Sequence, residues 1–229
     1  MKTLAMIPAR GGSKRIPRKN IKNFLGEPII KYSIEAAKGA GIFDEIMVST
    51  DDEEISRIAK SFGASVPFLR AKENSGDFSK TADVALEVLS EYKKRGIYFD
   101  RFACIYPAAP FIKPEDLKGA MEKMEEAKAD SVAAIVRFGR PIERAFRLEK
   151  GFMRMIHPSN ISKRSQDFPP AYCDAGQFYC LKTDHFLKKK EFFTKKTVGF
   201  EMPESRVQDI DNLEDWRLAE IKYNFNNQK

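Results

Sequence analysis

The chain has 229 residues, of which 42% are hydrophobic and 32% charged, and its formal net charge is +7. This length fits one domain with a substantial core, and the composition is that of an ordinary soluble enzyme. No apolar stretch approaches the length of a membrane span. Because Arg10 cuts short the first apolar segment, we expect no signal peptide. Three cysteines and two histidines without metal-type spacing indicate a reduced, cytoplasmic protein.

The first expected element is a buried strand from Thr3 to Ile7, and a basic loop with two adjacent glycines follows it. The loop has no acidic residue, and its cations are Arg10, Lys14, Arg15, Arg18 and Lys19. Glycines let backbone N–H groups approach phosphate oxygens, and the carboxyl end of a first strand is a usual place for polyanionic ligands. Taken alone, the loop fits a plain basic surface turn equally well. It matches neither the Walker A motif nor the dinucleotide fingerprint.

Strand and helix signals then alternate as far as residue 136, which predicts a mostly parallel α/β sheet with helices on both faces. A helix is expected after Pro28, and the further strands are expected at 45–50, 65–69, 101–107 and 131–136. The helices between and after them are expected at 52–62, 81–95 and 114–127.

After Arg137 the rhythm changes, and the pattern predicts a hairpin at 145–156 followed by a long polar loop at 157–172. A strand returns at 176–182, and a last helix starts after Asn212 with Asp215 in a partial capping box. We find no repeat, no low-complexity linker and no second domain boundary. The chain therefore reads as a single domain, 1–229, with an insertion at about 138–172 that we expect over the substrate.

Two carboxylates stand two positions apart ahead of the last helix, in RVQDID at 206–211. In an extended segment Asp209 and Asp211 point to the same side. Hard oxygen ligands so placed suit Mg²⁺, which proteins usually hold with one or two carboxylates and substrate phosphates. A capping role for Asp211 is the alternative, but it leaves Asp209 without a function. From the residues alone, a Mg²⁺ site at Asp209 and Asp211 and a cap by Asp211 both stay open.

The segment PARGGSKRIPRKN, residues 8–20, resembles the motif PARGGSK-x-I-P-x-K-N of the cytidylyltransferases that activate nine-carbon acidic sugars. The resemblance implies a Rossmann-like nucleotidyltransferase domain that binds CTP. It gives Arg10 and Lys19 to the triphosphate, with Lys14 and Asn20 in support, and makes Arg10, Lys19 and Asp211 the catalytic residues. The nucleotide contacts that it implies are Ala9, Arg10, Gly11, Gly12, Ser13, Lys14, Lys19, Asn20, Arg70 and Ser79.

Two further segments bear on the nucleotide site. Asp52 reads best as a helix cap, whereas Ser49 and Asp51 remain weaker candidates beside the nucleotide. Residues 68–81 resemble the family segment in which an Arg and a hydroxyl touch cytidine, which supports Arg70. The hydroxyl stays open among Ser75, Ser79 and Thr81, because Ala71 and Asn74 depart from the family pattern.

The sugar is indicated by RSQD at 164–167 and DAGQFY at 174–179. These segments resemble the cytidylyltransferases of pseudaminic acid, whereas neuraminate-activating members usually carry a pattern ending N-G-A-I-Y. The resemblance directs Arg164, Gln166, Asp174 and Gln177 toward the sugar acid, with Arg164 suited to its carboxylate.

The resemblance implies an enzyme that transfers CMP from CTP to a nine-carbon sugar acid with Mg²⁺ and works as a homodimer. Because the family carries D-I-D or D-x-D at 209–211 as its metal site, the resemblance favours Asp209 and Asp211 as the Mg²⁺ ligands. We expect neither nucleic acid nor membrane as a partner. A CMP-neuraminate or CMP-legionaminate synthetase is the alternative within this class. A basic RNA-binding protein is the alternative from another class, but the loop lacks interleaved aromatics and no RNA-recognition motif occurs.

Overall fold

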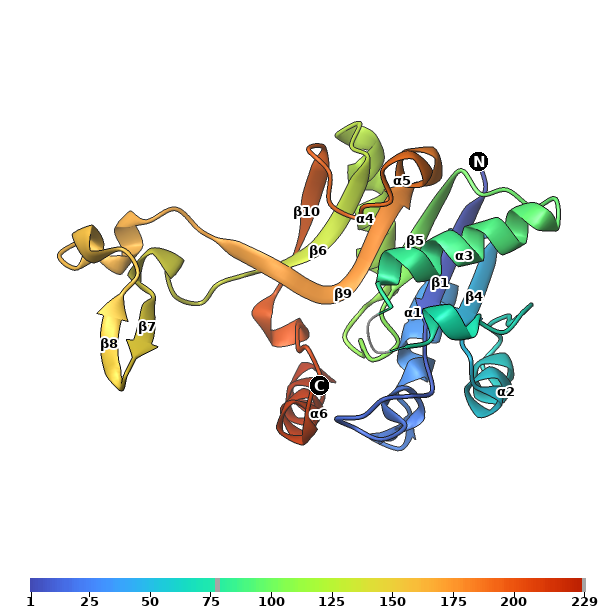
Figure 1. The fold of residues 1–229 in the computed structure, drawn as a ribbon, viewed down its shortest axis with the longest axis horizontal. Coiled ribbons are helices and arrows are strands. Elements are labelled where there is room, and N and C mark those ends of the chain that lie inside the picture. Colours follow the sequence, from blue (N-terminus) through green and yellow to red (C-terminus); the bar gives the residue numbers. More distant parts are fainter. Residues whose placement is uncertain (77–78, 228–229) are drawn as a thin grey trace.

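A mixed six-stranded sheet forms the centre of the computed structural model, which describes residues 1–76 and 79–227 (Figure 1). The strand order is β10-β6-β9-β5-β1-β4. Neighbours pair in parallel except β9, which runs antiparallel to both β5 and β6. The bounds are β1 Thr3–Pro8, β4 Glu45–Ser49, β5 Arg101–Ile105, β6 Ser131–Arg137, β9 Tyr172–Lys182 and β10 Thr197–Met202. The predicted α/β domain with a mostly parallel sheet is confirmed.

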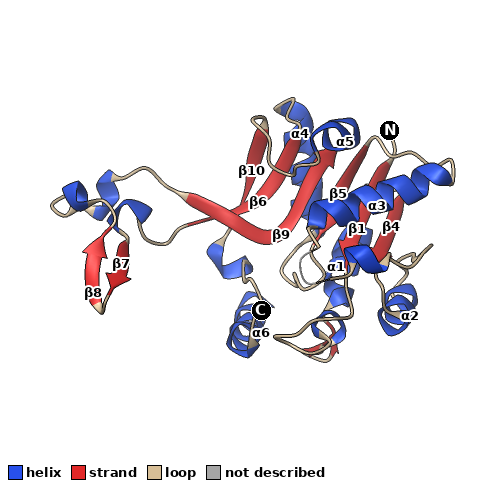
Figure 2. Ribbon diagram, viewed as in Figure 1, coloured by secondary structure: helices blue, strands red, loops and turns tan. Residues whose placement is uncertain are grey.

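Helices cover both faces of this sheet, because its strands alternate between two apolar cores (Figure 2). In β1, Ala5 and Ile7 point to one core while Leu4 and Met6 point to the other. The first core is closed by α1 (Ile30–Ala40), α2 (Glu53–Ser61) and α4 (Pro114–Glu126). The second is closed by α3 (Thr81–Lys94) and α5 (Thr183–Lys189).

A third, smaller core lies beneath the basic loop. Ile16 of the loop packs there with Ile210 and with Trp216 of the last helix, α6 (Leu213–Asn227). Phe24 belongs to the short hairpin β2–β3 (Asn23–Phe24 and Glu27–Pro28), and its ring meets that of Trp216 edge-on at 5.5 Å. This core joins the beginning of the chain to its end, and so brings the basic loop close to the segment of the two carboxylates.

The structure corrects one expected strand and adds elements that the sequence did not predict, among them the short hairpin β2–β3. Residues 65–69 form no strand, only a single parallel bridge from Ser65 to Met47. Pro67 has no N–H group to donate, which limits any ladder at this edge of the sheet. Strand β10 and helix α5 were not expected, whereas α1, α2, α3, α4 and α6 occur where helices were predicted.

Residues 138–171 form an arm that projects from the ends of β6 and β9 (Figure 1). Its hairpin pairs β7 (Phe146–Glu149) with β8 (Phe152–Met155), as the sequence predicted, and turns at Lys150 and Gly151 with φ of 52° and 85°. The arm also holds short 3₁₀ turns at Ile142–Arg144, Pro158–Asn160 and Ser165–Asp167.

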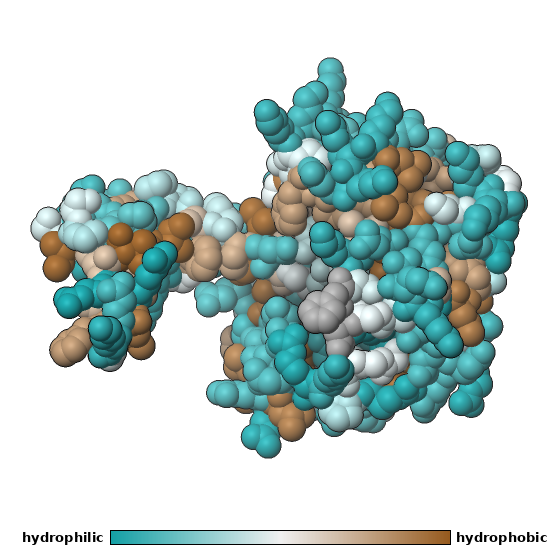
Figure 3. Space-filling view, in the orientation of Figure 1, coloured by the Kyte–Doolittle hydropathy of each residue, from teal (hydrophilic) through white to brown (hydrophobic). Residues whose placement is uncertain are grey.

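This arm extends away from the body of the chain that carries it, so its expected place over a sugar site stays a prediction (Figure 3). The hydrogen bonds of its side chains are internal, for example from Asn160 Nδ2 to the Glu143 carbonyl at 3.2 Å. Its hairpin is left with exposed apolar side chains, among them Leu148 and Phe152 at 77% and 66% exposure.

Among residues 1–76 and 79–227, none of the helices combines the length and the apolar character that a membrane span requires.

Candidate active site

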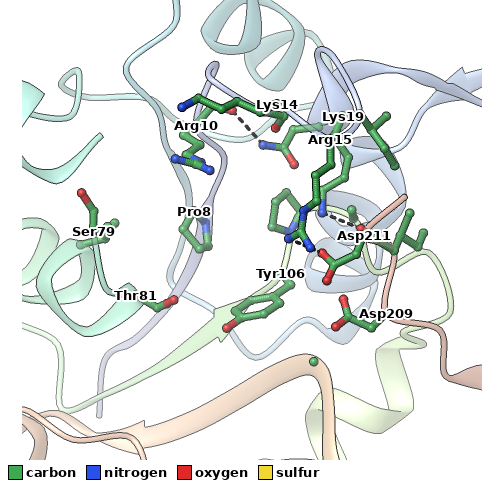
Figure 4. A pocket seen from close by; sticks show the side chains of 18 of the residues that line it. Pro8, Arg10, Lys14, Arg15, Lys19, Ser79, Thr81, Tyr106, Asp209 and Asp211 are labelled. Atoms are coloured by element: carbon green, nitrogen blue, oxygen red, sulfur yellow. Dashed lines mark hydrogen bonds and ion pairs between the residues drawn. The ribbon is translucent and has the colours of Figure 1, made fainter. Parts of the chain in front are cut away.

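A cavity of about 400 Å³ opens where β1 ends and the basic loop begins (Figure 4). Segments from five parts of the chain line it, which is the position that open α/β sheets use for ligands. The lining residues are Pro8, Arg10, Ser13, Lys14, Arg15, Ile16, Lys19, Asn20, Arg70, Asn74, Gly76, Ser79, Thr81, Val84, Tyr106, Pro107, Ala108, Gly176, Asp209, Ile210 and Asp211.

The basic loop supplies one wall of the cavity, and its end is held by side chains that reach backbone oxygens. Lys19, which starts the 3₁₀ helix η1 (Lys19–Ile21), donates from Nζ to the Ile210 carbonyl at 2.7 Å. The buried Asn20 donates from Nδ2 to the Arg10 carbonyl at 3.0 Å. Burial lowers the pKa of Lys19, while the charges of Asp211 and Asp209 act against that shift. The lysine thus places positive charge beside the two carboxylates.

The carboxylates of Asp209 and Asp211 both line the cavity, as their spacing predicted (Figure 4). Between them, Ile210 packs into the core beneath the loop. Asp211 Oδ1 lies 2.8 Å from the guanidinium of Arg15. Burial raises the pKa of Asp209, and the nearby charge of Asp211 raises it further. A positive charge beside these two carboxylates would offset their mutual repulsion and the cost of partly burying them.

The cap of α6 is provided by other groups. The side chain of Asn212 accepts from the backbone N–H groups of Glu214 and Asp215 at 2.8 and 3.0 Å. Asp215 in turn accepts from the N–H groups of Asp211 and Asn212, so the predicted capping box is confirmed. The carboxylate of Asp211 is therefore left to the cavity and to Arg15.

These carboxylates fit a Mg²⁺ ion that also has substrate oxygens as ligands. Within residues 1–76 and 79–227 no group of three or more His, Cys, Asp or Glu side chains is arranged to hold a metal. A protein site with only two hard carboxylate donors is the kind that Mg²⁺ shares with phosphates and water. The donor set at Asp209 and Asp211 is therefore compatible with Mg²⁺ bound together with a nucleotide.

The opposite wall carries Arg70 and two hydroxyl groups. Arg70 is buried and donates from Nε to Ser49 Oγ at 3.0 Å and from Nη2 to the Ser49 carbonyl. Of the three hydroxyl candidates, Ser79 and Thr81 line the cavity. Ser75 instead donates to the Ala71 carbonyl at 2.9 Å. The predicted nucleotide contact at Ser79 is thus in a position to act, and Thr81 is its neighbour.

Three of the predicted loop contacts do not line the cavity. Ala9 is buried and donates its N–H to the Ser49 carbonyl at 2.8 Å. Gly11 donates to Asp51 Oδ1 at 2.9 Å, and Gly12 has open space around it. Asp52 caps α2 by accepting from two backbone N–H groups, as the sequence predicted.

The residues predicted for the sugar lie outside the wall of this cavity. Asp174 accepts from the N–H of Gly176 at 2.9 Å and from the Tyr179 hydroxyl at 2.5 Å. Gln177 is fully buried, and its Oε1 finds no donor in the part of the chain that the structure describes. Arg164 and Gln166 lie on the arm, where Arg164 pairs with Asp167 at 3.0 Å. Their role toward a sugar stays a prediction.

Several lining residues escaped the sequence analysis. Arg15 was counted among the loop cations without an assigned partner, and Tyr106 lay in the strand expected at 101–107 without an assigned role. Gly176 lies within DAGQFY, has a φ of 59°, and would direct a Cβ to 3.8 Å from Asp209 Cγ. Each residue lay in a segment that the sequence analysis had singled out, but only the fold shows that the three border the same cavity.

Comparison with known proteins agrees with this geometry. The profile of the family described as Cytidylyltransferase matches residues 4–224. The chain is 41% identical to the pseudaminic acid cytidylyltransferase of Campylobacter jejuni, over 100% of this chain and 99% of the relative. It is 32% identical to the CMP-N,N'-diacetyllegionaminic acid synthase of Legionella pneumophila, over 96% and 95%.

The fold itself has a close counterpart among solved structures. The structure of CMP:2-keto-3-deoxy-manno-octonic acid synthetase complexed with CTP superposes with a TM-score of 0.70 at 17% identity, covering 99% of both chains. At that identity the likeness concerns the fold alone. The sequence relatives and the family profile, however, span nearly the whole chain. This chain is a member of the cytidylyltransferase family.

Proposed function

We propose that this enzyme transfers CMP from CTP to the anomeric hydroxyl of pseudaminic acid and releases pyrophosphate. The choice of sugar is supported above all by the 41% identity to the pseudaminic acid cytidylyltransferase of C. jejuni, which extends over 100% of this chain and 99% of the relative. The relative named for legionaminic acid is less similar, at 32%. The segments RSQD and DAGQFY point the same way.

The charges and hydroxyl groups that line the cavity support this reaction. The sugar hydroxyl oxygen bonds to the α-phosphorus, the bond from that phosphorus to the pyrophosphate oxygen breaks, and the hydroxyl proton leaves to solvent. Such a displacement depends mainly on alignment and on neutralising phosphate charge. Arg10, Lys14 and Lys19 border the cavity, so we assign the triphosphate to them. Arg70 and Ser79 on the opposite wall are assigned to the cytidine.

Asp209 and Asp211 would hold Mg²⁺ together with phosphate oxygens of the nucleotide. When bound, the ion supplies positive charge that stabilises the pentavalent transition state at the α-phosphate. Lys19 supports this arrangement from the protein side, because its ammonium holds the backbone carbonyl between the two carboxylates. A Cβ at Gly176 would lie in van der Waals contact with Asp209, 3.8 Å from its Cγ.

Pyrophosphate release tests this function directly. The enzyme is incubated with CTP, Mg²⁺ and one nine-carbon acid at a time: pseudaminic, legionaminic or N-acetylneuraminic acid. We expect the highest kcat/KM with pseudaminic acid. A preference for either of the other acids would reject the proposed sugar but keep the reaction, whereas no pyrophosphate with any acid would reject the reaction.

We further propose that the enzyme is a cytoplasmic homodimer joined through the arm. The free thiols of Cys104, Cys173 and Cys180 fit a reducing compartment. The arm carries exposed apolar side chains that a monomer would leave in water, Leu148 and Phe152 among them. We take the partner that covers these side chains to be a second copy of this chain, because most soluble oligomers are homo-oligomers.

The dimer would also give Arg164 and Gln166 a route to a sugar, namely in the pocket of the other copy. Light scattering should show a dimer that Leu148→Asp converts to a monomer. Mixing Lys19→Ala subunits with Arg164→Ala subunits should restore up to about a quarter of the activity, because half the dimers are mixed and each has one intact site. No restoration, with mixed dimers demonstrated, would place Arg164 outside the partner's site.

A further inference from the structure

The basic loop is attached to the first turn of α2 by a residue that does not line the cavity. Arg18 donates from both terminal nitrogens to the carboxylate of Asp52, with Nη2 at 2.9 Å from Oδ1, and Nη2 also meets Glu54. The same Asp52 oxygen, Oδ1, accepts from the N–H groups of Glu54 and Ile55 at 3.0 and 2.9 Å. One carboxylate therefore caps α2 and holds the loop at the same time.

The backbone at Arg18 turns neighbouring side chains in different directions. Arg18 adopts a left-handed conformation, φ 55° and ψ 30°, which is uncommon for a residue with a long side chain. Its guanidinium reaches α2, whereas the next residue, Lys19, reaches the Ile210 carbonyl. Ile210 belongs to the carboxylate segment, residues 206–211. The loop is thus held at two sides, by adjacent residues, between elements far apart in the chain.

A third contact brings the glycine turn to the same anchor. Gly11 donates its N–H to Asp51 Oδ1 at 2.9 Å, and a Cβ on Gly11 would come within 2.7 Å of Asp52 Oδ2. The backbone beside Arg10 therefore rests directly on the Asp51–Asp52 turn. Both ends of the loop that carries Arg10 and Lys19 meet the start of α2.

We propose that Arg18 is a positioning residue, which fixes the basic loop against Asp52 so that Arg10 and Lys19 are preorganised for the triphosphate. The inference rests on the proposed use of this cavity for CTP. A bidentate guanidinium–carboxylate pair gives directional as well as electrostatic attachment, which a lysine at the same position would lack. The expected benefit is in nucleotide binding, since Arg18 borders neither the cavity nor the carboxylate pair.

The variants Arg18→Asn and Asp52→Asn test this without disturbing the backbone. Asparagine tolerates the left-handed conformation at position 18 and is as good a helix cap as aspartate at position 52. Hydrogen exchange of the nucleotide-free protein should show faster exchange at Gly11 and Ser13 in both variants. Unchanged exchange would overturn the positioning role, and because no CTP is present this readout does not depend on the proposed reaction.

Steady-state kinetics then separates positioning from direct contact. Each single variant should raise KM for CTP by about five- to tenfold with kcat nearly unchanged, and the double variant should be no worse than either. Arg18→Lys should recover only part of the loss. An effect of Arg18→Asn that is absent in Asp52→Asn, or effects that multiply in the double variant, would mean that Arg18 contacts the nucleotide itself.

The matched control is Arg57→Gln, which removes one positive charge from an exposed position of the same helix, α2. We expect it to leave both KM and the exchange of the loop unchanged. A rise in KM equal to that of Arg18→Asn would attribute the effect to net charge and overturn the proposal. If the wild-type enzyme releases no pyrophosphate from CTP, the proposed function fails, while hydrogen exchange still decides the role of Arg18.

Discussion

Lys19 and Ile210 are 191 positions apart in the chain, yet the Lys19 ammonium donates to the Ile210 carbonyl across 2.7 Å. The bond ties the basic loop to the segment whose carboxylates face the same cavity. Because burial lowers the pKa of Lys19 and the aspartates oppose that shift, loop and carboxylate segment depend on each other electrostatically. Four predictions follow from this arrangement and its surroundings.

Lys19→Ala should lower kcat/KM by about 100-fold or more, because it removes both the proposed triphosphate ligand and the hydrogen bond to the Ile210 carbonyl. Lys19→Arg should recover part of the activity. Pyrophosphate release measures both, with Lys60→Ala on the exposed side of α2 as control. Activity of Lys19→Ala within threefold of the wild type would contradict the assignment.

Asp209→Asn should abolish Mg²⁺-dependent turnover and at the same time stabilise the metal-free protein. The pKa of Asp209 is raised, which means that its ionised form is disfavoured by folding and costs stability above the folded pKa. Removing the charge should therefore raise Tm near pH 7, by about 2 °C. Calorimetry in EDTA measures this, and Glu214→Gln, an exposed neutralisation at the start of α6, should change neither Tm nor turnover. A lower Tm for Asp209→Asn would contradict the prediction.

The pairing of Arg18 with Asp52 should make stability depend on acid pH. Hydrogen bonds from Arg18 lower the pKa of Asp52 from 3.8 to about 2. A lowered carboxyl pKa gives stability that is present above pH 3.8 and is lost as pH falls toward 2. Asp52→Asn should thus cost about 1 to 2 kcal/mol at pH 6, and the difference from the wild type should shrink below pH 4. Urea unfolding at several pH values measures it; a constant difference would rule the charge effect out.

Gly176→Ala should reduce both stability and activity. With φ at 59°, any side chain strains the backbone by about 1 kcal/mol, and here the Cβ would also face Asp209. Gly41→Ala is the matched control, because Gly41 has a φ of 63° and open space around it. Both variants should lose similar stability in urea, but only Gly176→Ala should lower kcat/KM, by about tenfold. If Gly176→Ala and Gly41→Ala had equal kcat/KM values, Gly176 would have no role in the active site.

Much of the fold follows from local patterns. The alternation in β1, the helical spacing of α3 and α4, and the cap of α2 by Asp52 are each contained within a few consecutive residues. Residues 65–69 had the composition of a strand, but a strand forms only where a neighbouring strand pairs with it. In this segment only Ser65 pairs, through a single bridge to Met47. Strand β10 lies at the sheet edge and is stabilised by its pairing with β6. Local sequence patterns do not reveal that pairing either.

For the site, local patterns already contain the chemical groups: a cationic glycine loop, and two carboxylates whose spacing turns both to one side. Those features depend on residue type and on distances of two to a dozen positions. The three-dimensional fold is what brings Lys19 to the Ile210 carbonyl and Arg18 to Asp52. It also decided that the arm bearing Arg164 and Gln166 points away from its own cavity. These relations depend on how distant apolar faces pack, above all on the core of Ile16, Ile210 and Trp216, and no local spacing encodes that packing.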